Sequence, residues 1–506
     1  MIALCHNRCV IENVADLVAE SARRRPGHVA LVDGDRRTTY AGLDSAIDAF
    51  ASGLSAAGVQ PGDRVAMLLG NRTEFVVAYF GTLRRGAVAV PLNPASSVEE
   101  VRHAVAETSP QLLFSDVPLH GGEWLPEDIP VRVLVAGSRQ WADMVAEGRR
   151  NPQPVPAGDP ASLAVVLFTA GSTGRPKGAM LTHRALVDNV TQLLALEQPA
   201  AMTEDDVVLG VLPLFHVYAL NSVLALTLAA GATLVLEPRF FPRQTLERVR
   251  ETGVTVIGGA PPMYIAWSAE PDLRRMLQSV RLLTSGSAPL PSAVFEQFKT
   301  TASLPIWEGY GLTECSPVVA NTLVSGSPKA GSVGKPLPGF EVMLVDAGGD
   351  PSEDGTGEIF VRGASLFSGY WPDGHGGPDG NGWFATGDVA VVDDDGDLRL
   401  VDRRDELILV SGFNVYPREV ERVIEEMPGA AEVAVIGVPH PYSGEAVKAF
   451  VRPMAGREIE SADVVAHCEE NLARFKCPTI VEVVPEIPHS SVGKIARGQL
   501  REMSEQ

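Results

Sequence analysis

The feature that most constrains the fold of this chain is an alternation of short apolar runs with helical stretches, which continues to about residue 400. The runs are rich in Val, Leu and Ile, and examples are residues 64–69, 87–91, 163–169, 233–236, 254–258 and 280–284. Strands that alternate with helices form βαβ units, and such units build parallel sheets. The pattern predicts an α/β protein with a large N-terminal region of mixed parallel-sheet subdomains.

After Gly339 the pattern changes to short strands and turns, which predicts a small β-rich subdomain containing strands near residues 357–362 and 389–400. Residues 371–380 are rich in Gly and Pro and predict a surface loop. At 506 residues the chain is too long for one hydrophobic core. A charged run at 402–406 indicates a boundary, so we expect an N-terminal domain at 1–402 and a separate C-terminal domain at 403–506. The latter reads as a small α+β module, with the elements helix 417–426, strand 431–438, strand 446–452, helix 461–472 and a last strand.

Composition excludes several classes of protein. The net charge of −21 opposes nucleic-acid binding, although backbone amides and a few cations can still hold ATP. Residues 217–236 are nearly long enough to cross a membrane, but polar residues and Gly231 interrupt them, so we expect a buried helix followed by a buried strand. Five scattered cysteines form no metal or CxxC spacing, and the N-terminus does not read as a signal peptide. A reducing cytoplasm is therefore expected.

The strongest local motif occupies residues 167–178, where an apolar strand runs into a glycine- and hydroxyl-rich loop. Glycines let backbone amides approach phosphate oxygens, and a lysine adds a compact positive charge. Only seven lysines occur beside 35 arginines, so a lysine at this position is informative. The motif is not a Walker loop. A plain flexible loop is the alternative, but the composition favours a phosphate-binding loop formed by Thr169, Gly171, Ser172, Thr173, Gly174 and Lys177.

With the later motifs, this loop resembles the adenylate-forming enzymes, which include acyl-CoA ligases, peptide-synthetase adenylation domains and luciferases. The resemblance extends from Thr39-Tyr40 to Lys494 and is closest to coumarate-type and fatty-acyl CoA ligases. It implies that ATP adenylates a carboxylic acid and that coenzyme A then takes the acyl group. The chain departs from the family at Ala170, where a small hydroxyl residue is usual, and this removes one phosphate contact.

The resemblance also assigns nucleotide contacts. Residues 310–314 read Tyr-Gly-Leu-Thr-Glu, which implies that Thr313 contacts the α-phosphate and that Glu314 helps hold Mg²⁺. Such a role suits Mg²⁺, which takes one or two carboxylates with phosphate oxygens. Asp388 and Arg403 are implied to bind the ribose, whose two hydroxyls suit a carboxylate acceptor. The remaining implied ATP and AMP contacts are Tyr310, Gly311, Gly286, Ser287 and Ala288, although a plain turn is the alternative for residues 286–288.

In the C-terminal module the resemblance implies that Lys494 is the adenylation lysine, with a solvated surface lysine as the alternative. Gly412 and Phe413 are implied to meet the coenzyme A channel, and Asp405 to act as the hinge. The two half-reactions need different groups at one site, and the family achieves this by rotating the small domain.

The implied acyl and coenzyme A channel includes His216 as an aromatic gate, with a purely structural histidine as the alternative. The implied acyl wall is formed by Tyr218, Gly286, Gly311, Pro317, Val318 and Val319. None of these side chains is charged, and a buried unpaired charge costs several kcal/mol, about 2–7 for a polar group alone. A largely apolar monocarboxylic acid, fatty, aryl or bulky, is therefore expected, with Gly286 and Gly311 leaving room for its body.

Three other functions are alternatives. A ligase that loads an acyl-carrier protein would share every motif up to the thiol step. A hydrolase or a dehydrogenase is disfavoured, because the sequence has no G-x-S-x-G and no G-x-G-x-x-G after a strand. A silent binding module is disfavoured by the joint presence of Lys177, Glu314, Asp388, Arg403 and Lys494.

Overall fold

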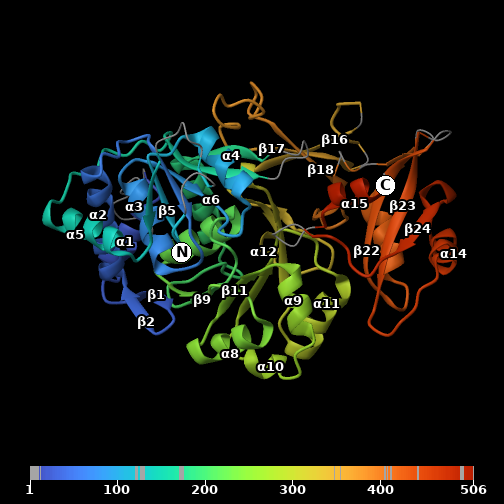
Figure 1. The fold of residues 1–506 in the computed structure, drawn as a ribbon. Helices are drawn as coiled ribbons and strands as arrows, with labels where there is room; N and C mark the ends of the chain where they lie inside the picture. The colour runs from blue at the N-terminus through green and yellow to red at the C-terminus, as the bar shows by residue number, and fades with distance from the viewer. Residues whose placement is uncertain are drawn as a thin grey trace. The chain divides into compact units, whose positions relative to one another are not determined.

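The computed structural model describes residues 11, 13–119, 124–125, 131–169, 176–346, 348–353, 355–403, 406, 408–410, 413–440, 444–489 and 495–504. The chain forms two compact units (Figure 1). The first comprises Met1–Glu341 and Val361–Phe384, and the second comprises Val342–Phe360 and Ala385–Gln506. Each unit is described by itself.

The larger sheet of the first unit has nine strands in the order β15-β14-β13-β12-β11-β9-β10-β1-β2. The strands from β13 to β1 in this order are parallel, and β14, β15 and β2 run antiparallel to their neighbours. Their bounds are β1 Val29–Asp33, β2 Arg36–Thr39, β9 Val207–Gly210, β10 Thr233–Leu236, β11 Val256–Gly259, β12 Leu282–Ser285, β13 Ile306–Gly311, β14 Val318–Asn321 and β15 Lys335–Pro336.

The second sheet of this unit has six strands in the order β6-β5-β3-β4-β7-β8. All pairs are parallel except β7 with β8. The bounds are β3 Arg64–Leu68, β4 Val88–Pro91, β5 Leu112–Ser115, β6 Arg132–Val135, β7 Leu163–Thr169 and β8 Lys177–Thr182. The predicted parallel α/β architecture is confirmed, and all six apolar runs named from the sequence are strands.

Helices fill the crossovers between these strands. Their bounds are α1 Asp16–Arg24, α2 Tyr40–Ala56, α3 Thr73–Arg84, α4 Val98–Thr108, α5 Arg139–Arg150, α6 His183–Leu194, α8 Pro242–Thr252, α9 Pro261–Ser268, α10 Leu273–Met276 and α11 Ser292–Gln297. Local sequence explains several starts: Ser97 and Glu100 form a capping box at α4, and proline stands in the first turn of α8 and α9.

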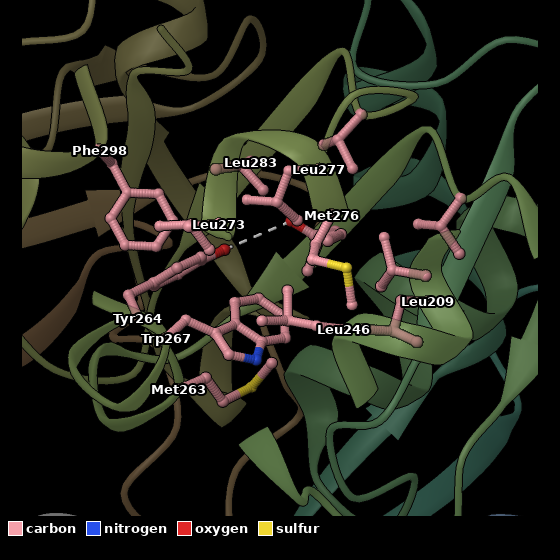
Figure 2. Packing of buried hydrophobic residues seen from close by; sticks show 14 of the residues in the cluster. Leu209, Leu246, Met263, Tyr264, Trp267, Leu273, Met276, Leu277, Leu283 and Phe298 are labelled. Carbon is pink, nitrogen blue, oxygen red and sulfur yellow. Dashed lines mark hydrogen bonds between the residues drawn. The ribbon is translucent and has the colours of Figure 1, made fainter. Parts of the chain in front are cut away.

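One core cluster lies between the nine-stranded sheet and helices α8 to α11. Figure 2 shows Trp267 and Tyr264 beside Leu246, Met276 and Phe298. The Trp267 indole also donates to the Pro242 carbonyl at 3.0 Å, which fixes α9 against α8. Each fully buried large apolar side chain contributes about 1.5–3 kcal/mol, so this cluster supports the sheet rigidly.

Residues 217–236 form a buried helix followed by the buried strand β10, as expected. The helix differs from an ordinary one, because Tyr218–Ala225 form a π-helix, η1, which continues as α7 Leu226–Ala230. Gly231, with φ +84°, ends it. Among the helices of the described residues, none has the length and apolar character needed to cross a membrane.

Most of the four-stranded sheet β16-β17-β18-β19 belongs to the second unit; its bounds are β16 Glu341–Val345, β17 Thr356–Arg362, β18 Phe384–Val392 and β19 Leu398–Arg403. The C-terminal module follows, with β20 Ile408–Val410, β21 Phe413–Val415, α13 Pro417–Glu425, β22 Ala430–His440, β23 Gly444–Pro453, α14 Ser461–Asn471, β24 Ile480–Val483 and α15 Arg497–Ser504.

The predicted order of helix, two strands, helix and strand in this module is confirmed, and the β20–β21 hairpin and α15 are additional. Val420, Val435 and Val451 belong to its own hydrophobic core. The expected boundary between residues 402 and 403 does not coincide with the limits of the compact units, so the hinge stays a prediction.

Candidate active site

The segments predicted to bind substrates follow the carboxyl ends of neighbouring parallel strands. Residues 211–216 follow β9, residues 286–288 follow β12, and residues 312–314 follow β13. In open α/β sheets, ligands bind at this edge. The topology therefore brings the segments with His216, Gly286, Ser287, Ala288, Thr313 and Glu314 to one edge of the nine-stranded sheet.

The ends of the phosphate-binding loop are held by the antiparallel pair β7 and β8. Thr169 lies opposite Lys177, and its hydroxyl donates to the Lys177 carbonyl at 3.4 Å. Gly178 permits close packing here, because a Cβ at this position would lie 2.6 Å from Val166 Cγ1. Lys177 is thus fixed at the base of the loop. The loop residues Ala170, Gly171, Ser172, Thr173 and Gly174 lie outside the described residues.

A five-residue segment, Phe367–Trp371, connects β8 with the turn that carries Glu314. Its Phe367 amide donates to the Glu314 carbonyl at 2.8 Å, and its Trp371 amide donates to the Gly178 carbonyl at 2.8 Å. Between them, Ser368 and Gly369 exchange main-chain bonds with Met180 at 2.9 and 3.1 Å. The Phe367–Trp371 segment therefore lies along the edge of β8 and fixes the distance between β8 and Glu314.

Tyr370 of this segment joins two residues predicted from the sequence. Its hydroxyl donates to Glu314 Oε1 at 2.6 Å, and Lys177 Nζ lies 5.5 Å from the centre of its ring. Glu314 is 9% exposed. It is the middle residue of the 3₁₀ turn η3, Thr313–Cys315. Tyr370 was not predicted to be a site residue. The sequence signal that could have indicated it is the aromatic pair Tyr370-Trp371, which follows Gly369 at the start of the Gly/Pro-rich loop.

Tyr218 and Gly286 of the predicted acyl wall lie side by side. A Cβ on Gly286 would lie 3.4 Å from Tyr218 Cε1, an ordinary van der Waals distance. The Tyr218 hydroxyl pairs with Thr284 Oγ1 at 3.1 Å. Burial raises the pKa of Tyr218 to about 12, so the phenol stays neutral at physiological pH. Thr284 was not predicted, although it immediately precedes the Ser-Gly-Ser turn.

Gly311 is the exposed last residue of β13, so the expectation that it leaves room for a large acyl group stays a prediction, and close packing of the main chain gives a second reason for the glycine. A Cβ at Gly311 would lie 2.0 Å from the Pro317 carbonyl oxygen and 3.1 Å from Val318 Cα. Gly311 faces Val318 across the β13–β14 pair, and Leu312 donates to Pro317 at 3.0 Å. The glycine is therefore needed for close approach of two backbones. Val319, on the same strand, is fully buried.

Buried asparagines hold the loops in place. Asn71 donates to the Gly210 and Leu212 carbonyls at 3.1 and 2.9 Å, and its Oδ1 accepts from the Leu214 amide at 3.0 Å. It thereby fixes the start of the segment that carries His216. Asn189 of α6 binds both main-chain groups of Val318, at 2.8 and 3.3 Å. Neither asparagine was predicted, because a single asparagine in a sequence gives no sign of its burial.

The predicted ribose contacts belong to the second unit. Asp388 of β18 pairs directly with Arg403 of β19 across an antiparallel ladder. Thr386 accepts from the Asp388 amide at 3.1 Å and donates to the Ile359 carbonyl at 2.9 Å, which anchors this position in the sheet. Phe413 begins β21. The predicted residues Asp405, Gly412 and Lys494 lie outside the described residues.

Glu314 is the residue predicted to hold Mg²⁺. The described residues contain no group of three or more His, Cys, Asp or Glu side chains able to hold a metal. Magnesium in nucleotide sites uses one or two carboxylates together with phosphate oxygens and water. The buried carboxylate of Glu314, which Tyr370 links to Lys177, can supply one such ligand.

Comparison with known proteins agrees with this geometry. Residues 18–371 match the AMP-binding enzyme family, and residues 419–494 match the AMP-binding enzyme C-terminal domain. The chain belongs to the AMP-binding enzyme family, which confirms the resemblance to adenylate-forming enzymes.

Its relatives include a feruloyl-CoA synthase from an Amycolatopsis species, 37% identical over 95% of this chain and 96% of the relative. A long-chain-fatty-acid–CoA ligase from Yersinia pestis is 33% identical over 97% of this chain and 94% of the relative. Among solved structures, ATP-bound MatB from Rhodopseudomonas palustris has a TM-score of 0.90 and 31% identity, over 98% of this chain and 99% of that one. The anthranilate CoA ligase AuaEII, in complex with anthranoyl-AMP, has a TM-score of 0.87 and 26% identity, over 97% of each chain. The expectation of an AMP-forming acyl-CoA synthetase is confirmed.

Proposed function

We propose that this enzyme adenylates a largely apolar monocarboxylic acid, fatty, aryl or otherwise bulky, and transfers the acyl group to coenzyme A. The contact of Tyr218 with Gly286 carries the proposal. It forms an uncharged wall whose one hydroxyl is already paired with Thr284. A second carboxylate or an amino group placed against this wall would meet no charged partner there, and burial without a partner is costly. The feruloyl and long-chain fatty-acid specificities of the relatives agree with this class of acid.

The roles of the nucleotide-binding residues follow from the charge that develops during adenylation. The acid carboxylate attacks the α-phosphate, so the site must stabilise negative charge on both groups. Lys494 supplies a positive charge at the attacking carboxylate, Thr313 binds the α-phosphate, and Lys177 binds the departing pyrophosphate. Asp388 and Arg403 hold the ribose. Glu314 would hold Mg²⁺, which when bound neutralises phosphate charge.

Thioester formation requires a different set of groups at the same site. We place the change in a rotation of the C-terminal domain, residues 403–506, relative to residues 1–402, with Asp405 as the hinge and Gly412 and Phe413 at the coenzyme A channel. His216 lies beside the same channel. The described cysteines, Cys315, Cys468 and Cys477, are buried thiols, and we propose a reducing cytoplasmic location, in which thiols persist.

A pyrophosphate-release screen over a panel of acids tests the substrate class. Long-chain, cinnamate-type and benzoate-type acids should release pyrophosphate, whereas malonate and free amino acids should not. A preference for malonate or an amino acid would refute the proposal. Each active acid is then tested with coenzyme A and with a phosphopantetheinyl carrier protein. Thioester formed on the carrier alone would establish the carrier-loading alternative.

A further inference from the structure

We propose that Tyr370 is a positioning residue for the metal-binding carboxylate: its hydroxyl fixes Glu314, and its ring fixes Lys177. The inference rests on the proposed function, in which Glu314 holds Mg²⁺ and Lys177 binds the β- and γ-phosphates. It adds a residue, and a means of coupling the metal ligand to the phosphate-binding lysine.

The bond between Tyr370 and Glu314 is short and directional. At 2.6 Å, an O–H···O⁻ contact lies in the range of charge-assisted hydrogen bonds, which are about twice as strong as neutral ones. The donor occupies Oε1, so the orientation of the carboxylate is restricted and Glu314 would be held ready to bind a metal ion. A carboxylate that binds Mg²⁺ through one oxygen gains from such orientation, because Mg²⁺ demands near-ideal octahedral geometry.

The same ring contributes to the position of Lys177. The ammonium lies 5.5 Å from the ring centre, within the distance at which a cation is attracted to the face of an aromatic ring. One side chain thus contacts a carboxylate through its polar end and a lysine through its face. Lys177 comes from β8 and Glu314 from η3, so Tyr370 sets the spacing between two separate elements.

The ring itself is held on several sides. Phe367 packs edge-on at 5.1 Å between ring centres, and His375 lies at 5.8 Å. The Tyr370 amide donates to the His375 carbonyl at 2.9 Å, and the Gly374 amide donates to the Tyr370 carbonyl at 2.8 Å. Gly369, with φ +92°, permits this turn, because a Cβ there would lie 1.9 Å from the Gly374 carbonyl oxygen. A residue held this firmly can impose its geometry on Glu314.

The test measures ATP binding to the full chain by titration calorimetry, in Mg²⁺ and in a chelator, without an acid substrate. Tyr370→Phe keeps the ring and removes the hydroxyl. The gain in ATP affinity on adding Mg²⁺ should therefore fall about tenfold, with little change in the chelator. Tyr370→Leu should lose the same gain and should also weaken metal-free binding, because Lys177 loses the ring.

Two further variants complete the design. Tyr40→Phe removes another buried hydroxyl bond, to the Ala232 carbonyl at 2.7 Å, and should leave both affinities unchanged. In a Glu314→Gln background, Tyr370→Phe should add little to the loss, since the two residues act as one unit. A Tyr370→Phe enzyme that keeps the wild-type Mg²⁺ gain, or that weakens ATP equally with and without Mg²⁺, would overturn the inference. If no acid in the panel is activated but this binding pattern holds, the substrate proposal fails while the role of Tyr370 stands.

Discussion

Two glycines in the predicted acyl wall have different surroundings. A Cβ on Gly286 would lie 3.4 Å from the Tyr218 ring, an ordinary contact distance. A Cβ on Gly311 would lie 2.0 Å from the Pro317 carbonyl oxygen, which is much shorter than any allowed contact. In the proposed acyl wall, a side chain at Gly286 would extend past the Tyr218 ring into the space proposed for the acid, whereas a side chain at Gly311 would displace backbone. The two positions are therefore a matched pair for separating pocket size from fold.

The first prediction uses this pair. Gly286→Leu should raise the KM for long or ring-containing acids by about tenfold or more and leave the KM for ATP near the wild-type value, because extra methylenes do not fit a packed site. Gly286→Ala should be mild. Gly311→Ala should lose activity with small and large acids alike and lower the melting temperature. Steady-state kinetics over acids of increasing size provide the measurement. Equal effects of Gly286→Leu on all acids would contradict the pocket assignment.

A second prediction concerns Lys494. Loss of its charge in Lys494→Ala should slow adenylation by about 100- to 1,000-fold, the usual cost of removing one group that stabilises developing charge. Thioester formation from supplied acyl adenylate should be nearly unaffected, because the lysine is displaced before that step. Separate assays of the two half-reactions check this, with Lys476→Ala as a control lysine that pairs with Glu419 in the same module. Equal loss of both half-reactions would remove Lys494 from its assigned role.

At the scale of elements, α6 links the phosphate-binding hairpin to the acyl wall. It follows β8 directly, and its Asn189 binds Val318 of β14. At its first residue, His183 Nδ1 accepts from the Val14 amide at 3.1 Å. Burial lowers the pKa of His183 to about 4, so the folded protein holds this imidazole neutral.

The third prediction follows from His183. The unfolded chain binds a proton near pH 6.5 and the folded chain only near pH 4, so the stabilisation is complete above pH 6.5 and is lost as the pH falls through that window. Between pH 7 and pH 5 the first unit should lose about 2 kcal/mol from this group. Urea unfolding at several pH values measures the loss. His183→Gln should make the free energy of unfolding depend less steeply on pH. An unchanged slope in the variant would assign the pH dependence to other groups.

The elements also show how far the sequence predicts this structure. Strands such as β7 and β10 were predictable because their apolar runs are short and bounded by turns. The π-helix η1 was not predictable, because one extra residue in a turn leaves the run of apolar residues unchanged. Lys177 and Glu314 were singled out by motifs, and the structure brings both into contact with Tyr370, while their roles toward ATP and Mg²⁺ stay predictions. Tyr370, Asn71 and Asn189 were not, because each acts through contacts with residues distant in the sequence.

For the whole molecule, the fourth prediction tests domain rotation. Proline fixes φ and removes an amide donor, so Asp405→Pro should hold one domain arrangement. Acyl adenylate should still form, and acyl-CoA production should fall by at least about tenfold, since each 1.4 kcal/mol added to a barrier costs that factor. Single-turnover measurement of both products, with Asp405→Ala as the control, decides the point. Wild-type turnover in the proline variant would place the hinge elsewhere.

The arrangement of the binding segments on separate strand ends has an evolutionary consequence. The segments after β9 and β12 are each braced from their own side, by Asn71 for the first and by Tyr264, through the Thr284 carbonyl, for the second. They meet where Tyr218 packs against Gly286 and pairs with Thr284. A mutation at this contact therefore acts on both segments, while Asn71 and Tyr264 keep the main chain on either side in place. For laboratory evolution, this makes joint randomisation of Tyr218, Thr284 and Gly286 a better route to new acyl specificity than the exchange of one segment alone.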